Sequence, residues 1–232
     1  MFNSRIRSTL PEIMDQVDLS EKDVVNALND IEKVNIYLGG YKVVLDALNQ
    51  LKWDKSSFSI LDIGSGGGDT LKAIAKWAIH KNVKVKLIGI DINPIMTKHA
   101  QLNCKDFPNI SFETCNVFDL DQLKHKTDIV LCNLFCHHFN DMDLVTLLKR
   151  MNDLSSAKII INDLHRHWFA YYSIKFITKF FSNSYMVKYD APLSVARSLT
   201  KVEWFSSLKF AGFTDFKIKW CWAWRWQIII NK

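Results

Sequence analysis

Two adjacent histidines, His137 and His138, have the residue type and setting for acid–base chemistry. They stand in the stretch NLFCHHFND, directly after an apolar run and before an acidic, polar one. A neutral imidazole has a pKa of about 6.5 and can take a proton from an activated hydroxyl group. A structural role is also open, in which a histidine bonds to the backbone and closes a turn. Cys132 and Cys136 stand beside the pair, but no second ligand pair follows at finger-like spacing, so we expect no metal site.

A second group of candidate residues follows a later apolar run, in the sequence NDLHRH. Here Asp163, His165 and Arg166 could bind a hydroxyl or carboxylate group of an acceptor molecule. Arg197, in DAPLSVARSLT, is a further candidate contact for an anion, and an ordinary surface charge is the alternative. We therefore expect the acceptor to meet His165, Arg166 and Arg197.

The glycine-rich stretch LDIGSGGGDT has the features of a cofactor loop. Gly64 and Gly66 allow the backbone to turn sharply and to approach a ligand closely. Asp91 ends the next apolar run, where a carboxylate can accept hydrogen bonds from both ribose hydroxyls of an adenosine. Asp62 directly precedes the loop, where it would crowd a pyrophosphate but could pair with an ammonium group. S-adenosylmethionine, which has an ammonium and no phosphate, is therefore favoured over NAD or FAD.

The segments that carry these residues alternate between strand-like and helix-like patterns. This alternation predicts βαβ units and a parallel sheet that is covered by helices on both faces. In such sheets ligands bind beyond the carboxyl ends of the strands, which is where the glycine loop, Asp91, the histidine pair and the NDLHRH cluster fall. The strands are predicted in FSILDIG, VKLIGIDI, ISFETCNV, TDIVLCNLF and AKIIINDL, and the helices in DTLKAIAKWAIHK, PIMTKHAQLNC and DMDLVTLLKRMND.

Helices are also predicted before this alternating region. Ser20 can cap a helix that extends to a pair of glycines, and YKVVLDALNQL predicts a second helix. Residues 1–54 would then form an N-terminal helical cap, and residues 55–232 the main domain. We expect the cap to close the cofactor site, with Tyr37 near it.

The region after the last alternating strand opens with an insertion on the acceptor side, residues 164–200. Its first part, residues 168–181, is rich in aromatic residues and has three interpretations. It could be a buried helix, a lid over a flat and apolar acceptor, or a helix lying at a membrane surface. A polar segment follows, and then a helix and two strands that are close enough to pair as a hairpin.

The ordered series LDIGSGGG, GIDIN, FETCNVFD, DIVLCNLFCHHF and IIINDL resembles the motifs of class I S-adenosylmethionine-dependent methyltransferases, in their small-molecule branch. The resemblance covers residues 58–163 and the C-terminal hairpin. It implies a Rossmann-like, doubly wound α/β fold with a seven-stranded, mostly parallel sheet and an antiparallel C-terminal hairpin strand. It also implies a set of cofactor-binding positions, which are Asp62, Gly64, Ser65, Gly66, Asp91, Ile92, Asn116, Val117 and Asn133.

The same resemblance limits the classes of molecule that could accept the methyl group. The sequence CNLF lacks the paired prolines typical of adenine and glutamine methyltransferases, and no Pro-Cys pair of a DNA cytosine enzyme is present. CHHFND is similar to the strand end of plant-type phenolic O-methyltransferases, in which the histidine is the base. Quinone-type C-methyltransferases have a similar pair, often with a structural histidine. We expect O-methylation of a small aromatic or polyketide-like metabolite in secondary metabolism. The alternatives are C-methylation of a quinol-like ring, carboxylate O-methylation, RNA methylation or a non-catalytic cofactor-binding partner protein.

Bulk composition is consistent with a single catalytic domain and an appended cap. The chain has 232 residues, of which 48% are hydrophobic, and it has a net charge of +6 spread along its length. No apolar run reaches the roughly 18 residues of a membrane span. Five scattered cysteines without a CxxC pair fit a reducing compartment. We expect a cytoplasmic protein that acts on a small molecule and has no nucleic-acid partner, and a homodimer is an open alternative to a monomer.

Overall fold

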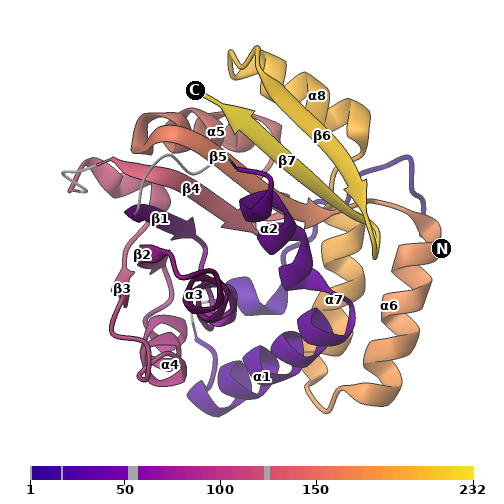
Figure 1. Ribbon diagram of the computed structural model, residues 1–232. Coiled ribbons are helices and arrows are strands. Elements are labelled where there is room, and N and C mark those ends of the chain that lie inside the picture. The colour runs from indigo at the N-terminus through magenta and orange to yellow at the C-terminus, as the bar shows by residue number, and fades with distance from the viewer. Residues whose placement is uncertain (1, 17, 52–56, 123–125) are drawn as a thin grey trace.

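The computed structural model describes residues 2–16, 18–51, 57–122 and 126–232. A seven-stranded sheet with the strand order β3-β2-β1-β4-β5-β7-β6 forms its centre (Figure 1). β1 to β5 are parallel, and β7 lies antiparallel between β5 and β6. The predicted Rossmann-like fold and its antiparallel hairpin are therefore confirmed. The strands are β1 (Ser57–Ile63), β2 (Lys84–Asp91), β3 (Ile110–Thr114), β4 (Thr127–Asn133), β5 (Ser155–Leu164), β6 (Phe216–Cys221) and β7 (Arg225–Asn231).

Helices cover both faces of the sheet because its central strands are apolar on both sides. One face packs against α2 (Gly40–Asn49), α3 (Asp69–Lys81) and α4 (Pro94–Asn103). The other packs against α5 (Asp141–Leu154) and α8 (Lys201–Phe210), where Trp204 is completely buried. Two of the free cysteines, Cys132 and Cys136, belong to this second core, with their sulfur atoms 3.3 Å apart.

Three helices and an N-terminal segment lie beyond the carboxyl ends of the strands. α1 (Glu21–Tyr37) begins at Ser20, whose hydroxyl accepts a hydrogen bond from the Asp23 amide, as predicted. α6 (Trp168–Phe181) and α7 (Tyr185–Arg197) lie side by side, and α1 packs against α7 (Figure 1). The remaining short helical turns are η1 (Ile13–Asp15), η2 (Val117–Gln122) and η3 (Cys136–His138).

The segment that forms α7 is predicted from the sequence only as a polar stretch, whereas in the structure it is a helix. Ser184 caps the helix, and Pro192 is tolerated inside it. Three polar side chains on α7 are buried or partly buried because they bind the N-terminal segment: Asp190, Ser194 and Arg197. The predicted domain boundary between residues 54 and 55 lies outside the described residues.

Candidate active site

A cavity of about 750 Å³ lies at the carboxyl ends of β1, β2 and β4. This volume is typical of sites for small molecules and cofactors. Its walls come from the glycine loop, the histidine turn η3, the helices α1, α6 and α7, and the turn between β6 and β7. The predicted site residues that line it are Asp62, Gly64, Ser65, Gly66, Asp91, Ile92, Asn133, His137 and His138.

The glycine loop has the backbone geometry that its sequence predicts. Gly64 has φ of +71°, and a Cβ atom there would lie 2.4 Å from the Phe135 ring. Gly66 has φ of +50°. The Gly64 and Ser65 amides both donate to the Ile90 carbonyl, which fixes the loop against β2. Only glycine fits position 64, and the loop backbone is thereby held at the cavity wall.

Asp62 has the unmet hydrogen-bonding capacity expected of a ligand contact. Its side chain is buried, and its Oδ1 atom has no hydrogen-bond partner among the described residues. Burial raises the pKa of this carboxyl well above its usual value, and the nearby Asp69 and Asp91 add to the effect. A buried carboxylate of this kind needs a cationic partner. The ammonium group of S-adenosylmethionine would supply one, so the site fits that cofactor.

Asp91 and Asn133 are held in fixed positions by their neighbours. The Asp91 carboxylate accepts hydrogen bonds from the amides of Gly66 and Asn93, each at 2.9 Å. Asn133 donates to the Thr70 hydroxyl at 2.9 Å and accepts from the Asn162 amide at 2.6 Å. These bonds orient both side chains before any ligand binds.

The two positions predicted to face the adenine after β3 do not line the cavity. Asn116 accepts a hydrogen bond from the Phe118 amide at 3.0 Å and so caps a local turn. Val117 is buried in the core formed with α5 and α8. Ile92, in contrast, is 64% exposed at the cavity wall and has a free apolar face. Tyr37, which we expected near the site, is 85% exposed and is not among the lining residues.

The histidine turn is built on a buried carboxylate at the end of β5. Asp163 is completely buried and accepts two hydrogen bonds from His137, from its amide at 3.0 Å and at its Nδ1 atom at 2.7 Å. Burial acts to raise the pKa of Asp163, but the facing His137 outweighs it and the pKa lies below its usual value. An ionised Asp163 requires the proton on Nδ1, which leaves Nε2 of His137 as the basic nitrogen. Asp163 therefore orients the histidine and does not itself line the cavity.

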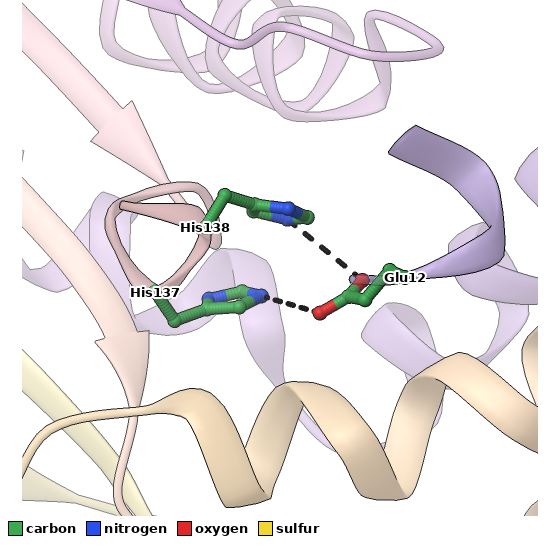
Figure 2. Close-up of side chains that lie close together, drawn as sticks. All are labelled: Glu12, His137 and His138. Carbon is green, nitrogen blue, oxygen red and sulfur yellow. Dashed lines mark ion pairs between the residues drawn. The ribbon is translucent and has the colours of Figure 1, made fainter. Parts of the chain in front are cut away.

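Glu12 completes this cluster, and nothing in the sequence alone points to it. Its carboxylate oxygens lie 3.6 Å from Nε2 of His137 and 3.9 Å from Nε2 of His138 (Figure 2). The Nδ1 atom of His138 lies 2.9 Å from Oδ1 of Asp15. The Ser194 hydroxyl donates to Glu12 at 2.9 Å. The Nε2 atoms of both histidines thus lie near one carboxyl from the N-terminal segment.

A proton shared within this cluster is consistent with its geometry. Burial raises the pKa of Glu12 to about 7, although His138 and Ser194 act in the opposite direction. The potential ligand atoms of Glu12, His137 and His138 lie within 4.8 Å of one another, and no other such group of acidic, histidine or cysteine side chains occurs among the described residues. Three donors at this separation could also hold a metal ion.

Two arginines fasten the N-terminal segment to the histidine turn. Arg197 donates to the carbonyls of His137, His138 and Leu10, at 3.3, 2.7 and 3.0 Å. Arg7 donates to the Phe139 carbonyl at 2.6 Å and to the Arg197 carbonyl at 2.5 Å. Arg197 is buried and fully engaged, which corrects its predicted role as an anion contact. It positions the turn that carries the histidines.

The other two predicted acceptor contacts are also placed away from the cavity. The buried Arg166 guanidinium donates to the carbonyls of Ser4 and Ser198 and pairs with Glu203. The His165 ring packs 4.6 Å from the Trp226 ring, and burial lowers the pKa of His165 to about 4. Neither residue lines the cavity, so Arg166 is placed as a hydrogen-bonding link between buried segments and His165 as a packing residue.

Comparison with known proteins agrees with this arrangement. Residues 60–157 match the family model described as a methyltransferase domain. The chain therefore contains a methyltransferase domain on a Rossmann-like sheet. No protein of curated function matches the sequence. The methyltransferase domain expected from the sequence motifs is confirmed, and solved proteins of the same fold contain SAH or SAM, consistent with S-adenosylmethionine as the cofactor.

Several solved methyltransferases share the fold at low sequence identity. The plantazolicin methyltransferase BpumL in complex with SAH is 17% identical, with a TM-score of 0.66 over 95% of this chain and 98% of that one. Magnesium protoporphyrin IX methyltransferase from Synechocystis PCC 6803, with bound SAH, is 17% identical, with a TM-score of 0.53 over 94% and 88%. Human N-acetylserotonin methyltransferase in complex with SAM is 19% identical, with a TM-score of 0.65 over 92% of this chain and 56% of that one.

Proposed function

We propose that this methyltransferase methylates a hydroxyl oxygen of a small aromatic or polyketide-like metabolite, with His137 as general base. The observation that carries the proposal is the pairing of His137 Nδ1 with Asp163 at 2.7 Å, which leaves Nε2 as the proton acceptor at the cavity. An imidazole oriented by a carboxylate in this way is a typical general base for a hydroxyl group.

The cavity residues divide between holding the cofactor and holding the acceptor. Asp62 would pair with the ammonium group, Asp91 would accept the ribose hydroxyls, and Ile92 would flank the adenine. Gly64 and Gly66 would lie along the methionine part. When bound, the cofactor supplies a methyl group on a sulfonium, which is already activated towards an oxygen nucleophile.

Proton removal is then the remaining chemical task of the protein. The acceptor O–H bond would lose its proton to Nε2 of His137, and the oxygen would take the methyl group. Asp163 stabilises the resulting imidazolium because its carboxylate is ionised and only 2.7 Å from Nδ1. Glu12 and His138, next to Nε2, could pass the proton on towards Asp15 at the half-exposed edge of the cluster.

The walls on the acceptor side favour a flat, apolar molecule. They are provided by α6 and by the turn between β6 and β7, opposite Phe135 of the histidine turn. Aromatic walls hold aromatic rings by stacking and exclude water from the methyl transfer. The apolar residues concerned are Phe135, Phe169, Ala170, Ile174, Ile177, Trp222 and Trp224.

A methyl-transfer screen over phenols, quinols and aryl acids, with mass detection of the product, tests this proposal. We expect a phenol to be methylated at oxygen by the wild type. The double variant His137→Ala/His138→Ala should bind S-adenosylmethionine normally in calorimetry and lose turnover. Unchanged turnover would refute the base assignment. A carboxylate acceptor needs no base, so a rate independent of pH between about 5 and 8 would instead indicate carboxylate methylation.

A further inference from the structure

The outer side of α6 carries an unusually large exposed aromatic surface. Trp168, Tyr172, Phe176 and Phe180 recur every fourth residue, which places them along one stripe of the helix. Phe176 and Phe180 are each 61% exposed, and their rings lie 4.7 Å apart. We call the stripe the aromatic face, together with its exposed neighbours Phe169, Phe181, Tyr185 and Tyr189.

The segment that carries the aromatic face, residues 164–189, has no negatively charged side chain of its own. Its lysines Lys175, Lys179 and Lys188, in contrast, are all exposed. The Lys175 and Lys179 amines extend over aromatic rings, 6.0 Å from the centre of Tyr171 and 5.6 Å from that of Phe180. Aromatic rings bordered by lysines that keep their amines in water are typical of helices at membrane surfaces.

The aromatic face is continuous with the cavity. Residues on the inner side of α6 line the cavity, and a shallow groove runs along the outer side. Phe169, Ser173 and Ile177 belong to both. A surface that covers the groove would therefore lie directly beside one wall of the cavity.

We propose that the aromatic face of α6 and the start of α7 docks on the surface of an anionic lipid bilayer. α6 has 14 residues, and no helix in the described part of the chain has the length and apolar character to span a bilayer. The helix would lie in the plane of the headgroups, with its aromatic rings inserted and its lysines on the lipid phosphates. Docking does not depend on the methylated atom, although it would place the proposed acceptor cavity next to an apolar phase.

Charge favours a bilayer over a second copy of the chain as the occupant. In a symmetric dimer the same patch faces itself, so the lysines of one copy would approach those of the other. Residues 164–189 contain no acidic residue that could compensate for that repulsion, and Asp30, which binds the connection between α6 and α7, is buried. Anionic lipids supply the missing negative charge and attract each lysine near the surface.

Co-sedimentation with vesicles tests the proposal without cofactor or acceptor, so it is independent of catalysis. Vesicles of phosphatidylcholine alone and of phosphatidylcholine with phosphatidylglycerol are compared, using the full chain. The test variant is Phe176→Ser/Phe180→Ser. Phe205→Ser/Phe210→Ser on α8, with side chains 51% and 70% exposed, is the matched control. Lys175→Gln/Lys179→Gln tests the charge contribution, with Lys81→Gln/Lys84→Gln as its control.

We expect the wild type and both controls to bind the anionic vesicles, and each α6 variant to bind at least about tenfold more weakly. Circular dichroism should show that the α6 variants remain folded. Failure of the wild type to bind anionic vesicles, or equal binding by all variants, would overturn the proposal. A dimer that forms without vesicles and is lost in Phe176→Ser/Phe180→Ser would also overturn it, in favour of a second copy.

Discussion

Replacing Glu12 by glutamine should change how the stability of the protein depends on pH. The pKa of Glu12 is about 7 in the folded protein, against 4.5 for an unperturbed glutamate. Each pKa unit corresponds to about 1.4 kcal/mol, so ionising Glu12 costs about 3 kcal/mol more in the folded than in the unfolded state. Because the pKa of Glu12 is raised in the folded state, its protonated form stabilises the folded protein. This contribution to the free energy of unfolding is fully present below about pH 4.5 and is lost as the pH rises through about 7. Glutamine cannot ionise, so the Glu12→Gln variant does not lose this free energy of unfolding as the pH rises.

Urea unfolding of the wild type and Glu12→Gln, from about pH 5 to about pH 9, measures this difference. The variant should gain about 2.5 kcal/mol of unfolding free energy relative to the wild type across that range. Comparing the two proteins cancels the contributions of the other titrating groups. Glu21→Gln, at an exposed glutamate on α1, is the control and should track the wild type. Parallel pH profiles for the wild type and Glu12→Gln would refute the assignment of a buried, protonated Glu12.

Three other predictions concern the ligand site. Asp62→Asn should weaken S-adenosylmethionine binding about tenfold or more in calorimetry, because it removes the carboxylate for the ammonium group; unaltered affinity would contradict that pairing. Asp163→Asn should lower kcat about a hundredfold with little change in KM, because it no longer fixes the proton on Nδ1 of His137; a change in KM alone would point to a role in acceptor binding. Dialysis against a chelator should leave the rate unchanged if the Glu12 cluster shares a proton, whereas loss of activity that a divalent ion restores would indicate a metal site.

The sheet and the cofactor loop could be predicted because their signals are local. Strand and helix periods alternate along the chain, and the turn at Gly64 needs a residue without a side chain at a fixed place between β1 and α3. The polar residues at strand ends, such as Asp62 and Asp91, follow from the topology alone. These features depend on neighbours in the sequence or on adjacent strands of one sheet.

The acceptor side could not be predicted because its contacts join distant parts of the chain. Glu12 reaches the histidines only because Arg7 and Arg197 fasten the N-terminal segment to the turn. A sequence does not distinguish an arginine that binds a ligand from one whose hydrogen bonds go to backbone carbonyls and carboxylates of the chain itself. Arg166 and Arg197 are of the second kind, although their sequence context predicts contacts with the acceptor. The helix α7 was missed for the same reason, since its polar residues are buried against the N-terminal segment.

The central claim is that His137 removes the acceptor proton. The most direct measurement is the single-turnover rate of methyl transfer by His137→Asn with saturating S-adenosylmethionine and acceptor, compared with the wild type. Asparagine can keep the hydrogen bond to Asp163 but lacks the basic Nε2 atom. The rate should fall by about a hundredfold to ten-thousandfold while S-adenosylmethionine binds with wild-type affinity. A rate within a few-fold of the wild type would contradict the account and leave His137 as a structural residue of the turn.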